Sequence, residues 1–205
     1  MIVIGITGSI GMGKTTAANM LREFGVPVHD SDASVHKLLG ADGAGVAAVA
    51  QKFPEAVKTD AAGRNFIDRQ VLGRIVFGDR QKKRDLEEIL HPMVRAESDA
   101  FKDEMKKKAH KIVALDIPLL FETGGEKRVD FTICVSAPEG VQRERVLARP
   151  GMTSEKFDRI VSGQLPDAEK RKRATYVVET DKGLDDMRKQ LEKILDRIRA
   201  KRRYH

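Results

Sequence analysis

The sequence has no tryptophan, and aromatic residues make up only 5% of its 205 residues. Aromatic side chains provide the surfaces on which single-stranded nucleic acids stack, so that binding function is not indicated. Cysteine is equally scarce. Cys134 is the one thiol, and its place in the apolar stretch Phe131–Val135 is typical of a small buried side chain. No grouping of cysteine and histidine suggests a structural zinc site.

Long apolar runs are also missing. No stretch approaches the length of a membrane span, and the chain enters a predicted strand at Ile2 rather than a signal peptide. We therefore expect a cytoplasmic protein with no membrane partner. The formal net charge of +7 suits nucleic acids, membrane surfaces and polyphosphate ligands equally well. With so few aromatic residues, small polyanionic molecules explain the charge at least as well as nucleic acid does.

Short apolar runs alternate with longer helical patterns, which indicates an α/β fold with a five-stranded parallel sheet flanked by helices. The predicted strands are Ile2–Thr7, Val26–His29, Ile112–Asp116, Phe131–Val135 and Tyr176–Val178. Helical patterns cover residues 14–24, 33–39, 45–53, 69–77, 80–108 and 184–199, with a break expected at His91–Pro92. The last pattern places an apolar face on the sheet, formed by Leu184, Met187, Leu191, Ile194, Leu195 and Ile198. About eighty residues between the second and third strands show no clear strand and exceed an ordinary crossover. We predict a core of residues 1–32 and 110–205, and a helical substrate-binding subdomain of residues 33–109.

The most informative segment is Gly8–Thr15, which has the spacing G-x-x-x-x-G-K-[ST]. It follows a predicted strand and precedes a predicted helix, the context in which this phosphate-binding motif is convincing. Its glycines allow successive N–H groups to surround one anion at the positive end of the helix. Lys14 can then reach the β- and γ-phosphates, and the Thr15 hydroxyl can bind Mg²⁺. A glycine-rich turn formed by chance is the weaker alternative.

The motif alone does not separate kinases from GTPases and mechanical ATPases. A GTPase is expected to carry an N/T-K-x-D guanine motif and a D-x-x-G switch. Neither string is present, since Asp116 is followed by Ile, Pro and Leu. The chain is also small for a mechanical ATPase, so a small-molecule kinase remains.

Two aspartates, Asp30 and Asp32, close the second predicted strand. Ligands of doubly wound sheets lie beyond the carboxyl ends of the strands, where a carboxylate can align an acceptor hydroxyl with the γ-phosphate. Aspartate is also a favoured cap for a helix that begins at Ala33. The residues support both roles equally for Asp32 and favour the cap for Asp30.

Other candidate residues lie farther along the chain. Asp116 ends a core strand and fits a carboxylate that supports Mg²⁺, with a strand-end turn residue as the alternative. Glu122 could face the same site, although a surface carboxylate is the default. Arg145 and Arg149 share a face of a predicted helix that ends at Pro150–Gly151. They could cover a triphosphate, but an exposed, salt-bridging helix explains their spacing better. His91 has an unusual setting before a proline and is not assigned to catalysis.

Together these motifs resemble the dephospho-CoA kinase family, whose members phosphorylate the ribose 3′-hydroxyl of dephospho-CoA in the last step of CoA synthesis. The resemblance runs from Ile4 to about Gly183. It rests on Gly5–Thr15, Asp30–Asp32, Leu90–Pro92, Leu115–Glu122, Gln142–Arg145, Arg149, Arg159, Ile160, Gln164, Lys170 and Ala174. The phosphate loop is generic, but the strings D-x-D, H-P and D-x-P-L-L-F-E in this order are highly specific.

The resemblance implies a P-loop kinase fold with a core, a small lid at about residues 143–158 and a helical CoA domain. It implies Mg²⁺-ATP as co-substrate and dephospho-CoA as the acceptor, and Thr15 and Asp116 stay the candidate residues for Mg²⁺. Asp32 matches the residue that orients or deprotonates the acceptor hydroxyl. The ATP-binding loop corresponds to Gly11, Met12, Gly13, Lys14, Thr15 and Thr16, and Arg145 and Arg149 match the lid arginines. His91 falls in the CoA domain, where a substrate-side or hinge role is implied but not assigned.

Three departures from the family pattern are visible. Thr15 stands where Ser is commoner, which is harmless because either hydroxyl can bind Mg²⁺. Pro150 replaces a usual Asp after the lid arginine, so the family pattern does not imply how the hinge of the lid behaves here. Glu179 and Thr180 replace a frequent Asp-Asn pair, which puts the adenine-side contacts in doubt. The alternative functions are a related kinase for another small alcohol or nucleotide, and a nucleic-acid-binding or regulatory ATP module.

Overall fold

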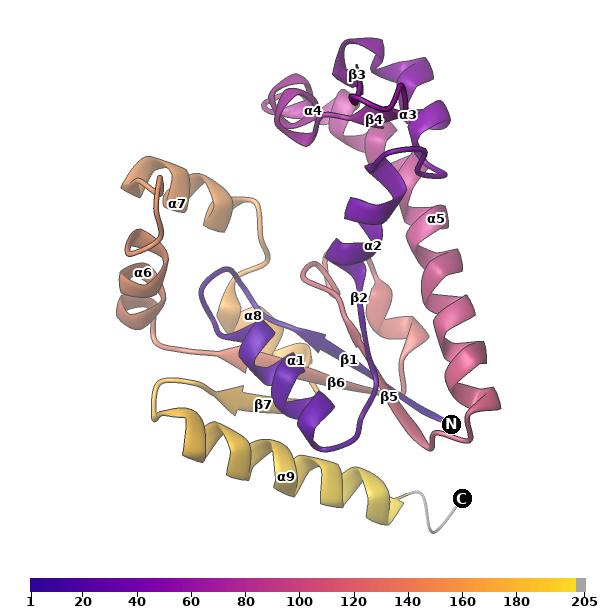
Figure 1. Ribbon diagram of the computed structural model, residues 1–205. Helices are drawn as coiled ribbons and strands as arrows, with labels where there is room; N and C mark the ends of the chain where they lie inside the picture. Colours follow the sequence, from indigo (N-terminus) through magenta and orange to yellow (C-terminus); the bar gives the residue numbers. More distant parts are fainter. Residues whose placement is uncertain (202–205) are drawn as a thin grey trace. The chain divides into compact units, whose positions relative to one another are not determined.

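The computed structural model describes residues 1–201. It divides into two compact units, one of Met1–His29 with the chain from Met105 onward, and one of Asp30–Glu104. The first unit is built on a five-stranded sheet in the order β2-β5-β1-β6-β7 (Figure 1). The strands are β1 (Ile2–Thr7), β2 (Val28–Asp30), β5 (Ile112–Asp116), β6 (Phe131–Ser136) and β7 (Tyr176–Glu179).

The predicted five-stranded parallel sheet is confirmed. β1 pairs in parallel with β5 and with β6, and β6 pairs in parallel with β7. β2 begins two residues later than predicted, after Pro27, whose ring leaves no N–H for the strand ladder. The carboxyl end of β1 continues into the glycine motif, so the motif lies at the edge of the sheet where the parallel strands end.

Around β6, the two faces of the sheet differ in polarity. On one face, alternate strand residues form a single apolar cluster with α1 (Lys14–Glu23) and α9 (Leu184–Lys201) (Figure 1). Its strand members are Ile4, Ile6, Ile112, Ala114, Ile133, Val135 and Val178. On the other face, β6 presents Thr132, Cys134 and Ser136, and α8 (Asp167–Arg173) packs against it. Leu184 was expected on the apolar face of the last helix, but it begins α9 and is 65% exposed, so that expectation is wrong.

Two more helices of this unit, α6 (Glu139–Leu147) and α7 (Ser154–Ser162), belong to the predicted lid region. The helix was predicted to end at Pro150–Gly151, but α6 ends at Leu147 and Ala148 caps it. Arg149 therefore lies in the turn beyond the helix, and its expected place on one helical face with Arg145 is wrong. The periodicity did not predict α7 or α8 as separate helices.

The second unit contains α2 (Ser31–Leu39), α3 (Val46–Lys52), α4 (Arg69–Val76) and most of α5 (Arg80–Lys107). It has its own apolar cluster, which includes Val49, Phe53, Ile67 and Leu72. Two short antiparallel strands, β3 (Val57–Thr59) and β4 (Asn65–Ile67), also lie here, so the expectation of no strand in this segment is wrong. Strands of three residues are too short to show a two-residue alternation.

The long helix α5 runs through Pro92 without the predicted break. A proline inside a helix removes one main-chain hydrogen bond and crowds the preceding turn. The helix has 28 residues, and Ile89 and Leu90 just before the proline belong to the apolar cluster of this unit. Packing on that cluster offsets the lost hydrogen bond. The predicted break rested only on the local preference of the residue before proline, which takes no account of this packing.

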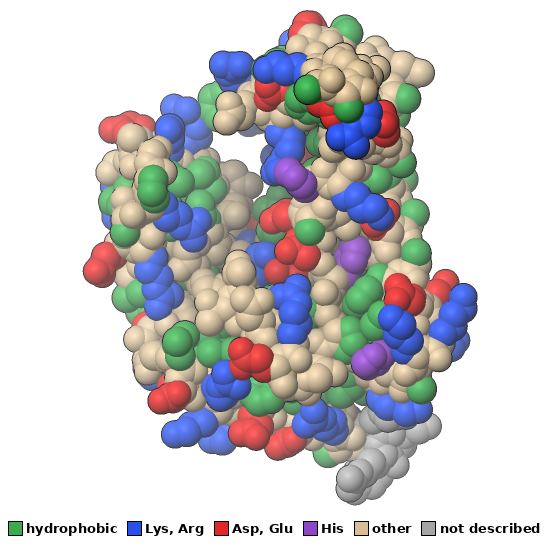
Figure 2. Space-filling view, in the orientation of Figure 1, with side chains coloured by type: hydrophobic (Ala, Val, Ile, Leu, Met, Phe, Trp, Pro, Cys, Tyr) green, Lys and Arg blue, Asp and Glu red, His purple; other side chains and the backbone are tan. Residues whose placement is uncertain are grey.

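Within residues 1–201, no helix combines the length and the apolar character needed to cross a membrane. On the face shown in Figure 2, Lys and Arg side chains are interspersed with Asp and Glu rather than gathered into one basic patch.

Candidate active site

The phosphate loop, Gly8–Thr15, connects β1 to α1 as the motif predicted. Gly11 has a φ of +78°, and a Cβ built on it would lie 2.5 Å from Cγ2 of Val146 in α6. The positive φ and the close approach both require glycine at this position. The Met12 N–H donates to the Ser9 carbonyl at 3.1 Å, which closes the turn. The result is a tight loop at the N-terminus of α1, the geometry of a main-chain anion site.

Lys14 and Asp116 form an ion pair beside this loop. The Lys14 ammonium donates a hydrogen bond to Oδ1 of Asp116. The pairing follows from the sheet, because the register of β1 and β5 sets Asp116 opposite Ile6, just before the loop begins. Both side chains are largely shielded from water, with exposed fractions of 16% for Lys14 and 5% for Asp116. Two predicted site residues are thus brought together at one end of the sheet.

The hydroxyl and carboxylate groups near the loop fit a magnesium ion. Thr15 is exposed at the start of α1, and the Asp116 carboxylate ends β5. Among residues 1–201, no group of three or more His, Cys, Asp or Glu side chains is arranged to hold a metal. A hydroxyl and one carboxylate are a suitable protein contribution for Mg²⁺, which keeps water and phosphate oxygens among its ligands.

Arg145 reaches from α6 to the segment that follows β7. Its guanidinium donates to Oγ1 of Thr180 at 2.9 Å and to the Thr180 carbonyl at 2.6 Å. The Thr180 hydroxyl in turn donates to the Met12 carbonyl of the phosphate loop at 2.9 Å. Thr180, one of the departures from the family pattern, therefore links the predicted lid arginine to the loop. Arg149 is exposed beyond the end of α6.

Asp30 and Asp32 take different parts at the start of α2. The Ala33 N–H donates to Oδ1 of Asp30 at 3.0 Å, so the capping role is confirmed for Asp30 and is wrong for Asp32. Asp32 lies exposed in the first turn of the helix, and no residue in the described part of the chain bonds to its carboxylate. His91 lies half-buried within α5. Both residues belong to the second unit, and their parts in substrate binding stay predictions.

Two glutamines hold a residue of the phosphate loop from both sides. Nε2 of Gln142 donates to the Ile10 carbonyl at 2.8 Å, and the Ile10 N–H donates to Oε1 of Gln164 at 3.1 Å. No spacing rule singles out either residue as a loop contact. Their presence among the residues that carry the resemblance is the only signal in the sequence.

Glu122 is exposed, as the default expectation of a surface carboxylate predicted, and its carboxylate is paired with groups outside the phosphate loop. Its Oε1 lies 2.9 Å from Nζ of Lys170 and accepts the Leu165 N–H at 2.8 Å. Lys170 is completely buried. The pair joins the segment after β5 to α8, and it holds the backbone next to Gln164.

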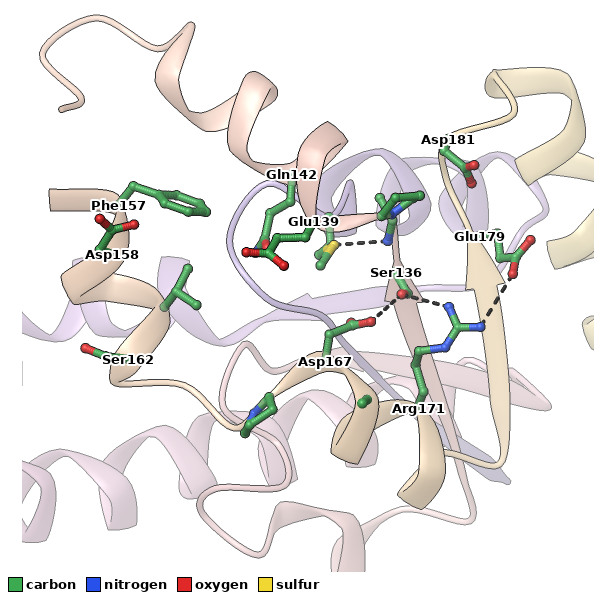
Figure 3. Close-up of a pocket in the computed structure, with 16 residues that line it drawn as sticks. Ser136, Glu139, Gln142, Phe157, Asp158, Ser162, Asp167, Arg171, Glu179 and Asp181 are labelled. Carbon is green, nitrogen blue, oxygen red and sulfur yellow. Dashed lines mark hydrogen bonds and ion pairs between the residues drawn. The ribbon is translucent and has the colours of Figure 1, made fainter. Parts of the chain in front are cut away.

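A pocket of about 700 Å³ lies between α7, α8 and the end of β6 (Figure 3). At its floor, Ser136 donates to Asp167 at 2.6 Å and accepts from Arg171 at 2.9 Å. Met12 and Gln142 contribute to its wall, so the pocket and the phosphate loop are neighbours. Glu179 also lines the pocket, and a hydrogen bond from Lys182 lowers the pKa of its carboxyl.

Cys134 takes no part in the site. The side chain is buried under α8, and burial raises the pKa of its thiol to about 12. The interpretation of this cysteine as a small buried side chain is confirmed.

Comparison with known proteins gives one consistent result. The family model described as dephospho-CoA kinase matches residues 2–186. A dephospho-CoA kinase from Mesorhizobium japonicum is 49% identical over 204 residues, covering 98% of this chain and 99% of its own, and one from Brucella melitensis is 47% identical over 201 residues, covering 98% and 97%. A solved structure from Thermus thermophilus has a TM-score of 0.80 at 38% identity, with 96% and 97% covered. A dephospho-CoA kinase from Campylobacter jejuni has the same fold, with a TM-score of 0.63 at 24% identity and 96% of each chain covered.

Proposed function

The chain belongs to the dephospho-CoA kinase family, and on this premise we propose that it transfers the γ-phosphoryl group of ATP to the ribose 3′-hydroxyl of dephospho-CoA. The observation that carries the proposal is the pairing of Lys14 with Asp116 beside a tight phosphate loop. An ammonium group and a carboxylate at this place can serve the phosphates and the metal of one nucleotide. Phosphoryl transfer needs little else from a protein than positioning and charge.

ATP binds with its phosphates in the loop. The N–H groups from Gly11 to Thr16 and the positive end of α1 face the β- and γ-phosphates, and Lys14 neutralises part of their charge. Thr15 and Asp116 are the residues that would hold Mg²⁺, which would neutralise part of the phosphate charge when bound. Magnesium and a cytoplasmic location are parts of this proposal.

Asp32 orients the acceptor. Its carboxylate is exposed and is not used as a helix cap, so it is available to accept a hydrogen bond from the 3′-hydroxyl. The hydroxyl oxygen then attacks the γ-phosphorus as the bond to the β-phosphate oxygen breaks. ADP leaves, and the hydroxyl proton passes to Asp32. His91 is assigned to the substrate side in the same unit.

The lid arginines act on the transferred group. Arg145 lies within reach of the phosphate loop through Thr180, and Arg149 follows it in the chain. Their guanidinium groups stabilise the charge that spreads over the γ-phosphate oxygens during transfer. Closure of the lid excludes water, which would otherwise compete with the acceptor hydroxyl.

Product analysis tests the proposal. The purified protein is incubated with Mg²⁺-ATP and dephospho-CoA, and the products are identified by mass spectrometry and ³¹P NMR. The expected product is CoA with a phosphomonoester at the 3′ position and one ADP for each CoA. A phosphate at another position, or efficient transfer only to a different alcohol or nucleotide, would contradict it.

Replacing the proposed base tests the mechanism separately. Asp32→Asn should lower kcat by about two to four orders of magnitude, the usual contribution of a positioned acid–base group, and leave ATP affinity within about twofold. Asp103→Asn is the control, because Asp103 is another exposed aspartate of the same unit. Turnover of Asp32→Asn close to that of the control would remove Asp32 from the mechanism.

A further inference from the structure

Ile10 lies in the middle of the phosphate loop, and both polar groups of its backbone are bound by side chains from outside the loop. The carbonyl accepts from Gln142 at 2.8 Å, and the N–H donates to Gln164 at 3.1 Å. Gln142 comes from α6, and Gln164 comes from the connection between α7 and α8. Loops commonly satisfy such groups with water, so two protein partners on one residue are a specific arrangement.

These contacts set the direction of two consecutive peptide planes. A trans peptide is planar, and its C=O and N–H point in opposite directions. When Gln142 holds the Ile10 carbonyl, the Gly11 N–H of the same peptide points away from Gln142. When Gln164 holds the Ile10 N–H, the Ser9 carbonyl of the preceding peptide points the other way, where it accepts the Met12 N–H at 3.1 Å. The first N–H of the anion site and the turn that follows are both fixed.

We infer that Gln142 and Gln164 are positioning residues, which orient the peptides around Ile10 so that the loop is preformed for the phosphates of ATP. The inference rests on the proposed function, since it assigns a nucleotide to the loop. Neither glutamine touches the reacting atoms in this scheme. They act through the loop backbone, and preforming it lowers the cost of ordering the loop when the nucleotide binds.

Each glutamine is itself held in place. Gln142 is 5% exposed, and its main-chain carbonyl oxygen would lie 3.1 Å from a Cβ on Gly11. Helix α6 therefore packs directly on the loop. Gln164 precedes Leu165, whose N–H donates to Glu122, and Glu122 is paired with the fully buried Lys170. The two amide groups are therefore presented by packed backbone rather than by free surface side chains.

The same residues connect the loop to the lid. The lid region of about residues 143–158 begins next to Gln142 and ends a few residues before Gln164. The residues that flank this segment on both sides are hydrogen-bonded to Ile10, so a change in the loop should alter the contacts on both sides of the lid. Arg145 lies one turn after Gln142 in α6. Loss of either glutamine contact should therefore weaken ATP binding more than it weakens binding of the acceptor.

The chemistry of the contacts provides a sharp test. The Ile10 carbonyl can only accept and its N–H can only donate, so Gln142 must present its NH₂ group and Gln164 its oxygen. An ionised glutamate side chain has two acceptor oxygens and no NH₂ donor. Gln142→Glu therefore loses the contact and sets a carboxylate against a carbonyl, whereas Gln164→Glu keeps its acceptor. Both variants add one negative charge next to the same loop residue, so each is the electrostatic control for the other.

The expected results concern ATP affinity, measured by calorimetry with a non-hydrolysable ATP analogue and no acceptor. Gln142→Glu should weaken binding by about tenfold or more, and Gln164→Glu by less than about threefold. Gln164→Met, which has no acceptor oxygen, should weaken binding more than Gln164→Glu does. In turnover, the KM for ATP should rise in the same order, with a smaller change in the KM for dephospho-CoA.

Stability separates positioning from folding. If Gln142→Glu does not fold, Gln142→Met takes its place, because it keeps about the length of the side chain in the buried site and removes the amide that donates to Ile10. Equal ATP affinity of the two glutamate variants would overturn the inference. So would a lowered melting temperature with unchanged affinity in Gln142→Met and Gln164→Met. A parent protein that binds ATP but does not phosphorylate dephospho-CoA would refute the proposed function and leave this test intact.

Discussion

The two faces of the five-stranded sheet are covered in different ways. The face under α1 and α9 carries one large apolar cluster, with Leu191, Leu195 and Ile198 completely buried in it. The face under α8 carries hydroxyl and charged groups. Ser136 bonds to Asp167 and Arg171 there, and Thr132 bonds to Thr175.

The difference separates stability from positioning. Apolar burial is not directional, so the first face can stabilise the sheet without fixing any group to a particular direction. Hydrogen bonds and ion pairs are directional, and on the second face they lead from Lys170 through Glu122 to the backbone beside Gln164 and on to the phosphate loop. We expect variants of the first face to change the free energy of unfolding alone, and variants of the second to change ATP affinity as well.

The largest effect is expected for Glu122→Gln. It leaves the ammonium group of Lys170 completely buried without its anionic partner, which should lower the free energy of unfolding by about 3–5 kcal/mol. Urea unfolding measures the loss, and ATP affinity should fall with it. The control is the double variant Glu122→Gln/Lys170→Met, which removes the buried charge and should recover much of the stability. A double variant less stable than Glu122→Gln would show that the pair is not what stabilises this face.

Leu191→Ala tests the apolar face. Truncation of this completely buried leucine should lower the free energy of unfolding by about 2–5 kcal/mol, because the site loses contacts and retains a cavity. ATP affinity of the folded protein should stay within about twofold of the parent. Leu184→Ala, on the same helix but 65% exposed, is the control and should cost less than about 0.5 kcal/mol. A large loss of ATP affinity in Leu191→Ala would erase the distinction between the faces.

Glycine substitutions measure the close approach of α6 to the loop. Gly11 and Gly25 both have a positive φ, +78° and +75°, but only a Cβ at Gly11 would meet other atoms. Gly25→Ala should cost about 1 kcal/mol of stability and leave ATP affinity unchanged. Gly11→Ala should also weaken ATP binding by at least about tenfold, since Val146 or the loop must move. The same change in ATP affinity for both variants would argue against the close packing.

The smallest effect concerns Cys134 on the polar face. With a thiol pKa of about 12, only about one molecule in ten thousand carries the thiolate at pH 8. Iodoacetamide should therefore label the protein only in denaturant. Because the pKa is raised in the folded state, this thiol stabilises the fold below pH 9, and that contribution falls as the pH rises toward 12. Rapid labelling of the native protein at pH 8 would contradict the burial.

The local pattern of the sequence was sufficient for the sheet and the phosphate loop. β1 and β5 were predicted to the residue, because their apolar runs are continuous and end at turn signals. The glycine motif fixes its own conformation within eight residues. Three expectations were wrong: that no strand lies in the segment of β3 and β4, that the helix breaks at Pro92, and that Leu184 is on the apolar face. Very short strands leave no periodic signal, and tertiary packing is not visible in the local pattern.

Contacts between distant segments were beyond the sequence. Gln142 and Gln164 meet Ile10 from 132 and 154 residues away, and Lys170 is buried although lysine is usually exposed. Spacing rules apply within one helix or strand and cannot bring such pairs together. The resemblance to a family marked these residues, but their physical roles became visible only in the three-dimensional contacts.

The most direct test of the account is the rate of ADP formation from Mg²⁺-ATP with and without dephospho-CoA. The account predicts slow hydrolysis by the protein alone and a strong, saturable stimulation by dephospho-CoA, with one CoA formed for each ADP. A rate of ADP formation that does not respond to dephospho-CoA would contradict it.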